Sequence, residues 1–142
     1  MMYGCEAWTL RKPEEDKIKA AEMWCYRRIL RVQWTEKRTN DSVLEELDVQ
    51  RSMLTEIIRR KMKYVGHAIR NPRTTLMATL LQGRVEARRR RGRPNTSYME
   101  NITESSGLPL SSVVHQSRDR REWRAIVRRT EAATAEPGDA DR

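Results

Sequence analysis

The stretch Arg-Arg-Arg-Arg-Gly-Arg-Pro at residues 88–94 constrains the fold of this chain more than any other segment. Guanidinium groups stay charged at every physiological pH, and neighbouring ones repel each other unless an anion lies among them. These residues therefore cannot enter a core, and residues 84–94 show no apolar periodicity. We predict an extended, Arg-rich arm over residues 83–94. It separates a helical domain at 13–82 from a short helix and a C-terminal helix at 95–130.

The composition narrows the class of protein. Its 142 residues fit one domain, and only 37% are hydrophobic against roughly 45–50% in average globular domains, so we expect a modest core. No apolar run is long enough to cross a bilayer, and the two cysteines and two histidines fit no zinc-ligand spacing. We therefore expect no metal, no cofactor and no membrane partner. The net charge of +9 favours polyanionic partners or anionic membrane surfaces. Two cysteines are too few for a disulfide framework, so we expect a reducing, intracellular setting, in the nucleus or the cytoplasm.

Apolar residues recur at helical spacing along most of the chain. A first helix is predicted from Pro13, because proline and the acidic residues after it suit a first turn, to about Val32. Its main apolar stripe comprises Ile18, Ala21, Cys25, Ile29 and Val32. After a short helix around Val43, a longer helix is predicted over residues 52–70. Its apolar half comprises Met53, Leu54, Ile57, Ile58, Met62, Val65 and Ile69.

The remaining segments predict further helices with more interruptions. Residues 74–82 are expected to add a turn or two of helix, and residues 95–105 a short helix around Ile102. Ser111 or Ser112 is expected to cap a last helix that reaches about Arg129. Residues 1–12 form an entry segment, and the composition of residues 131–142 predicts a disordered tail. The expected fold class is therefore all-α: a small helical bundle with a basic extended arm and a disordered C-terminal tail.

Basic residues gather on the helix sides that face away from the apolar stripes. On the 52–70 helix this basic face comprises Arg59, Arg60, Lys63, His67 and Arg70, diluted only by Glu56. On the last helix it comprises Arg118, Arg121, Arg124, Arg128 and Arg129. The first helix has a basic side as well. Helices that bury their apolar sides against each other are expected to leave one shared cationic surface, which the arm extends.

Two residues break this pattern. Lys61 points into the apolar half of its helix, and we expect its stem to lie on the core while its ammonium group reaches water. A buried, functional lysine is the alternative interpretation. Trp24 lies among the arginines of the first helix. It either packs against another part of the protein, such as the Trp8 segment, or stacks on an unpaired base.

The sequence contains no pattern typical of catalysis. It has no isolated pair of carboxylates, no glycine-rich phosphate loop and no cluster of metal ligands, so we do not expect an enzyme. Residues 91–94, Arg-Gly-Arg-Pro, also match the core of an AT-hook, in which arginines flanking a glycine enter the minor groove of DNA. In a chain with this many arginines, a solvated basic loop or a nuclear import signal is the alternative.

Five blocks, taken in order, resemble the region that follows the polymerase domain in reverse transcriptases of non-LTR retrotransposons. They are YGCEAWTL (3–10), EMWCYRRIL (22–30), RRKMKYVGHAIR (59–70), RRGRP (90–94) and DRREWR (119–124). The resemblance implies a C-terminal piece of an endonuclease–reverse transcriptase polyprotein that grips template RNA or target DNA. The catalytic motifs of that family do not occur in these residues, so no catalytic residue is carried over. Tyr98 stands where relatives have tryptophan, and the acidic C-terminal end also departs from the family.

The predicted function is therefore non-catalytic binding of RNA or DNA through phosphate contacts, with neither nucleic acid preferred. The predicted binding residues are Arg88, Arg89, Arg90, Arg91 and Arg93 of the arm, with Arg59, Arg60, Lys63, His67 and Arg70 of the 52–70 helix. Trp24 is the candidate for stacking. One alternative is a helical module that docks on the polymerase domain of the parent polyprotein. Another is a truncated retroelement fragment without function.

Overall fold

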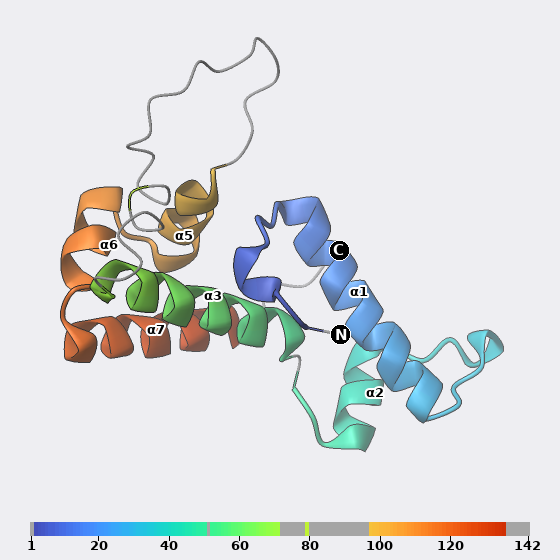
Figure 1. The fold of residues 1–142 in the computed structure, drawn as a ribbon. Helices are drawn as coiled ribbons and strands as arrows, with labels where there is room; N and C mark the ends of the chain where they lie inside the picture. Colours follow the sequence, from blue (N-terminus) through green and yellow to red (C-terminus); the bar gives the residue numbers. More distant parts are fainter. Residues whose placement is uncertain (1, 51, 72–78, 80–96, 136–142) are drawn as a thin grey trace, which may run out of the picture.

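The structure is a computed structural model, and it describes residues 2–50, 52–71, 79 and 97–135. Every regular element within these ranges is helical, which confirms the all-α fold class (Figure 1). The elements are η1 (Cys5–Ala7), α1 (Lys12–Ile29), η2 (Trp34–Glu36), α2 (Asn40–Leu47), α3 (Met53–Arg70), α5 (Tyr98–Ser106), α6 (Leu110–Gln116) and α7 (Arg120–Ala135). The predicted arm, most of residues 74–82 and the end of the predicted tail lie outside the described residues.

Helix α3 is the centre of the fold. It contacts α7, η1, α1 and α5, and α7 lies along it in the opposite direction (Figure 1). The apolar half predicted for this helix is confirmed, because Leu54, Ile57, Ile58, Met62 and Val65 are all buried in the main core cluster. Burial of such side chains contributes roughly 1.5–3 kcal/mol each, so this helix supplies much of the stability of the fold.

The closest approach of α3 and α7 occurs at Gly66. A Cβ atom at this position would lie 2.3 Å from both Cδ1 and Nε1 of Trp123, so only glycine leaves room for the indole ring. The ring is buried, and its N–H donates to the carbonyl oxygen of Met62 at 2.8 Å. This contact therefore fixes the two helices closely against each other at Gly66.

Helix α1 meets α3 through a buried carboxylate rather than through its predicted apolar stripe. Oε1 of Glu22 accepts the backbone N–H groups of Ser52 at 2.9 Å and Met53 at 3.0 Å, and the hydroxyl of Tyr26 at 3.0 Å. The first N–H groups of a helix need external acceptors, and Ser52 makes no side-chain cap of its own. Glu22 is consequently only 3% exposed, whereas Ile29 of the predicted stripe is 67% exposed. The predicted helix is confirmed, and Ile18 of the stripe packs against the core. The stripe is wrong at Ile29, because the buried face of the helix also holds this polar contact with α3.

The N-terminal segment belongs to the core, which the sequence did not indicate. Cys5 and Leu10 are buried, and η1 packs on α3. The side chain of Asn101, from α5, pairs with the backbone of Leu10: its Nδ2 donates to the carbonyl at 2.7 Å, and its Oδ1 accepts the N–H at 3.3 Å. The hydroxyl of Tyr98 donates to the carbonyl of Glu6 at 2.7 Å. Polar side chains of α5 therefore satisfy backbone groups of this segment that a neighbouring strand or a helix would otherwise satisfy.

Lys61 contradicts the prediction that its ammonium group reaches water. The residue is 1% exposed; its Nζ donates to Oδ1 of Asn101 and lies 5.4 Å from the centroid of the Tyr98 ring. Burial lowers the pKa of Lys61 to about 8. The N-terminal segment and α5 close over the helix face where the side chain was expected to emerge, so no path to solvent remains.

The predicted last helix is divided into two, α6 and α7. Oδ1 of Asp119 accepts the N–H groups of Arg121 at 2.6 Å and Glu122 at 3.1 Å, so an aspartate caps the new helix, as is typical. Helix α6 begins after Pro109 rather than at Ser111 or Ser112. Helix α7 continues to Ala135, so the first residues of the predicted tail are helical. Among the described residues, no helix is both long enough and apolar enough to cross a membrane.

Candidate nucleic-acid interface

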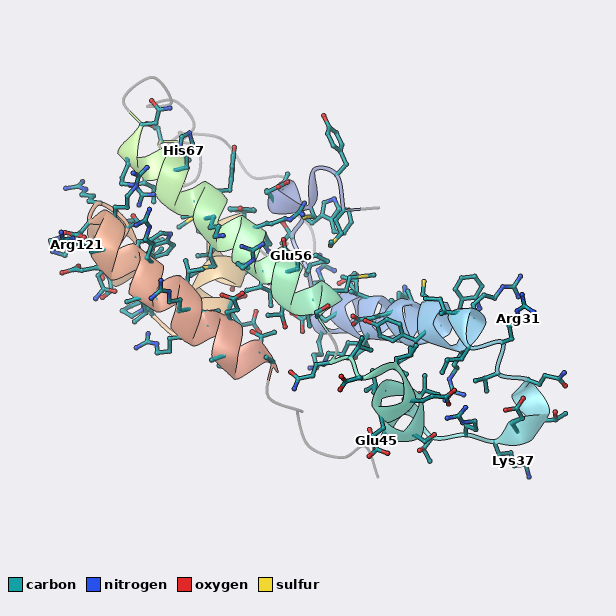
Figure 2. All side chains as sticks on the ribbon, turned by 90° about the horizontal axis from the view of Figure 1, so that it is seen from below. Arg31, Lys37, Glu45, Glu56, His67 and Arg121 are labelled. Carbon is teal, nitrogen blue, oxygen red and sulfur yellow. The ribbon has the colours of Figure 1, made fainter. Side chains whose placement is uncertain are left out.

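The junction of α3 and α7 carries two parallel rows of basic side chains. Spacings of three and four residues place Lys63, His67 and Arg70 along one edge of α3, and Arg120, Arg124 and Arg128 along one edge of α7. The antiparallel pairing of the two helices brings these edges together. We call these six residues the α3–α7 basic surface. In Figure 2, the labelled His67 of α3 and Arg121 of α7 lie at the same end of this helix pair, with Glu56 toward the other end.

At one end of the pair, which we call the open end, three guanidinium groups converge. Nη1 of Arg70 donates to the carbonyl oxygen of Ser117 at 2.5 Å, which ties the C-terminal end of α3 to the turn before α7. Burial lowers the pKa of Arg70, and the positive charges of Arg120 and Arg124 lower it further, with only a smaller opposing effect from Asp119. Like charges are therefore held close together here, an arrangement that a bound anion stabilises.

At the opposite end of the pair, which we call the paired end, the protein's own carboxylates neutralise the basic residues. Glu56 accepts from Arg59 at 2.5 Å and from Arg60 at 2.7 Å, and Nε of Arg59 also lies 3.8 Å from Oε1 of Glu131 on α7. Hydrogen bonds from both arginines hold the pKa of Glu56 below its ordinary value. Arg59 and Arg60 were predicted to bind nucleic acid, but the structure places both of them in ion pairs with the protein's own carboxylates.

The other predicted binding residues divide into two groups. Lys63 and His67 are exposed and Arg70 is half-buried, and no carboxylate lies within 4.0 Å of them in the described part of the chain. Residues Arg88, Arg89, Arg90, Arg91 and Arg93 lie outside the described residues. Sequence reasoning assigned Arg124 and Arg128 to a basic helix side but missed Arg120. The signal was the four-residue spacing of Arg120, Arg124 and Arg128, hidden by the expectation of one long helix.

The arginines of α1 do not join this surface, so the expectation of one surface shared by three helices was wrong. Figure 2 shows Arg31 and Lys37 at the far end of the molecule from Arg121 and His67. Trp24 is 62% exposed, with the guanidinium carbon of Arg28 5.6 Å from its ring centroid. The expectation that Trp24 packs against another part of the protein was therefore also wrong. Among the described residues, no group of three or more His, Cys, Asp or Glu side chains is placed to hold a metal ion.

Comparison with known proteins gives one informative similarity. The chain is 27% identical over 139 residues to a protein of Caenorhabditis elegans whose name gives it as uncharacterized and transposon-derived. The matched region covers 91% of this chain and 50% of the worm protein, so the chain spans about half the length of that relative. No protein-family model matches the sequence, and no solved structure matches it. The similarity points to a transposon origin.

Proposed function

We propose that this chain is a non-catalytic nucleic-acid-binding region of a retrotransposon reverse transcriptase, and that it contacts the phosphates of template RNA or target DNA. The observation that carries the proposal is the α3–α7 basic surface. Its six cationic or titratable side chains come from two helices, and no carboxylate lies within 4.0 Å of any of them among the residues described. A row of charges without internal partners is suited to a row of phosphates.

The chemistry of arginine favours phosphate over other anions for this surface. Its planar guanidinium group offers several N–H donors in a fixed geometry, which matches two oxygens of one phosphate. The open end has three such groups. The chain leaves α3 at Asn71, next to this end, and continues toward the Arg-rich residues 88–93. We propose that these Arg-rich residues and the α3–α7 basic surface contact the same strand or duplex.

The similarity to a transposon-derived protein supports the assignment to a retrotransposon reverse transcriptase. The similarity to a transposon-derived protein agrees with the five ordered blocks that resemble the region after the polymerase domain of non-LTR elements. A protein that copies RNA at a nicked DNA target must hold long polyanions during synthesis. A helical region that grips phosphates without reading bases fits that requirement, and no catalytic residue is needed within it.

The proposal is tested by the salt dependence of binding. Each phosphate neutralised on duplex DNA contributes about −0.9 to the slope of log affinity against log salt, and about −0.7 on a single strand. We expect a slope steeper than about −3 for a 20-base-pair duplex or a matched single-stranded RNA, measured by fluorescence anisotropy. A slope near zero contradicts the proposal. Competition between the two nucleic acids at fixed salt then determines which of them the chain prefers.

A second candidate function is docking on the polymerase domain of the parent polyprotein. The observation that favours it is the N-terminal segment, where Tyr3 is 100% exposed and Trp8 is 39% exposed. Exposed aromatic residues are common at protein interfaces. A pull-down against the upstream polymerase domain, with and without nuclease, distinguishes the two functions. Capture that survives nuclease supports docking, whereas capture lost with nuclease supports a nucleic-acid bridge.

A further inference from the structure

A second basic region lies where α1 ends and η2 begins. It encloses a hollow of about 1090 Å³, which we call the α1–η2 hollow. Its walls include one tryptophan and five basic residues: Trp24, Arg27, Arg28, Arg31, Lys37 and Arg38. Among the described residues that line it, none is acidic. The hollow is open to solvent and slightly larger than the roughly 300–1,000 Å³ of small-ligand sites, so it has room for a ligand of nucleotide size or more. The uniform sign of its charges selects an anionic ligand.

Two of the basic residues build the wall of the hollow. Nη2 of Arg27 donates to the carbonyl of Arg38 at 2.8 Å and to Oδ1 of Asn40 at 3.0 Å, which ties α1 to the start of α2. Arg38 donates to the carbonyl of Ser42 at 3.2 Å and forms an ion pair with Glu46 at 2.5 Å. The segment between α1 and α2 is therefore held in place by side-chain contacts, and these two guanidinium groups are already occupied.

The other three basic residues are available to a ligand. Arg28, Arg31 and Lys37 have no carboxylate within 4.0 Å in the part of the chain that the structure describes. Arg28 lies over the ring of Trp24, yet the tryptophan remains 62% exposed. Its large apolar ring thus faces solvent beside three cations that have no carboxylate partner in the described part of the chain. Such a combination of an aromatic platform and positive charge is how proteins hold single-stranded nucleic acid.

The backbone at Arg31 and Lys37 is unusual for basic residues. Their φ angles are 54° and 46°, in the left-handed region that glycine adopts without steric cost. Arg31 occupies the position after a helix end where glycine is common: its N–H donates to the carbonyl of Arg28, and the next N–H, of Val32, donates to the carbonyl of Arg27. Glycine at either position would suit the fold better than a side chain does. Strained positions of this kind tend to occur at functional sites.

We infer that the α1–η2 hollow binds an unpaired nucleotide, whose base stacks on Trp24 while its phosphates contact Arg28, Arg31 and Lys37. The inference rests on the proposed function and deepens it, because it assigns single-stranded nucleic acid to this site. The bases of a duplex are already stacked on each other and cannot reach the indole ring. The α3–α7 basic surface would hold phosphates of any strand or duplex, whereas the hollow would distinguish an unpaired strand from a duplex.

The test compares three probes on the full 142-residue chain. They are a thymidine decamer, an abasic decamer with the same number of phosphates, and a 20-base-pair duplex. Loss of one base–aromatic stack weakens binding roughly 5- to 150-fold. We expect Trp24→Ala to weaken binding of the thymidine decamer by such a factor and to leave the abasic decamer and the duplex within about twofold. Trp8→Ala, at the other partly exposed tryptophan on the described surface, is the matched control and is expected to change none of the three affinities.

The phosphate contacts are tested by Arg31→Gly with Lys37→Gly. This double variant is expected to weaken binding of both decamers, base-bearing and abasic, by about tenfold or more. Its melting temperature is expected to stay the same or rise, because glycine accepts the left-handed backbone. A fall in affinity together with unchanged or raised stability excludes misfolding as the cause.

Each outcome either supports or overturns the inference. If Trp24→Ala weakens the thymidine and abasic decamers equally, or weakens neither, no base stacks on this residue and the inference fails. That failure leaves the proposed function standing wherever the duplex still binds with a steep salt slope. In the reverse case, a salt slope near zero for both the duplex and the abasic decamer contradicts the role of the α3–α7 basic surface. A base-dependent loss on Trp24→Ala would then still support the hollow.

Discussion

The two ends of the α3–α7 pair contain the same kind of residue in two different electrostatic states. At the paired end, Glu56 and Glu131 neutralise Arg59 and Arg60. At the open end, the charges of Arg120 and Arg124 act on Arg70, and Asp119, which opposes them, caps α7. The comparison teaches that the number of arginines on a helix face does not determine the charge that it presents. The position of one or two glutamates decides whether the arginines support the fold or remain available to a ligand.

The largest expected effect comes from breaking the contact that holds both ends together. Trp123→Ala removes the indole ring that fills the space beside Gly66 and donates to Met62. Truncation of a buried aromatic residue costs about 3–5 kcal/mol. We expect the free energy of unfolding, measured by urea denaturation, to fall by this amount, and nucleic-acid binding to weaken with it. A loss below about 1 kcal/mol would show that α3 and α7 are held together elsewhere.

Lys61 differs from the arginines of both ends, because it is neither paired with a carboxylate nor open to solvent. Its pKa of about 8 in the folded protein lies below the value of roughly 10.4 in an unfolded chain. Between these values the unfolded chain binds more protons, so the free energy of unfolding rises with pH, by on the order of 2–3 kcal/mol. We expect that rise between pH 8 and 10.5 in urea titrations of the native protein.

The control for this prediction is Lys61→Met, which keeps the length of the side chain and removes its charge. Cys5, Tyr26 and Tyr98 also have pKa values raised by burial, and they oppose the rise as the pH increases. The measured quantity is therefore the difference between the native protein and the variant across the pH range. A constant difference from pH 7 to 10.5 would rule out the lowered pKa of Lys61.

Removing charge from the open end is expected to weaken binding, whereas the same change at the paired end is not. Arg120→Gln with Arg124→Gln eliminates two phosphate contacts, so the salt slope for duplex DNA should become shallower by about 1.8. Arg59→Gln with Arg60→Gln removes the same number of charges from already neutralised positions, and we expect its slope to match that of the native protein. Equal slopes for the two double variants would remove the distinction between the ends.

The smallest expected effect on stability comes from removing the carboxylate that pairs with the arginines of the paired end. Glu56→Gln releases both arginines, and we expect the free energy of unfolding to fall by about 0.5–1 kcal/mol and the salt slope to steepen by up to about 1.8. Because the pKa of Glu56 is lowered in the folded protein, its contribution is present above the unfolded value of roughly 4.3. It is lost as the pH falls through the lower folded value. The variant should therefore lose less stability than the native protein between pH 5 and 3.

Features that depend on neighbouring residues could be predicted from the sequence, whereas contacts between residues far apart in the chain could not. The apolar half of α3 was predicted because each turn of a helix repeats the same face, and α5 was predicted for the same reason. The buried role of Glu22 was missed, since its partners are the backbone N–H groups of Ser52 and Met53, about 30 residues away. The break between α6 and α7 was missed because the predicted helix ran through Asp119, which caps α7 instead.

The features of the candidate site also fall into those that local sequence predicts and those that depend on contacts between distant residues. The helical class and the basic edges of α3 and α7 follow from local sequence, because backbone hydrogen bonding and side-chain periodicity depend on near neighbours. The pairing of Arg59 and Arg60 with Glu56, three and four residues away, could also be predicted from it. The packing of the helices was needed to show that Arg70 lies near Arg120 and Arg124, that Glu131 reaches Arg59, and that Lys61 is enclosed. Those outcomes depend on which helix faces come together, and a charge is free or neutralised only after that packing has brought its partners within a few ångströms.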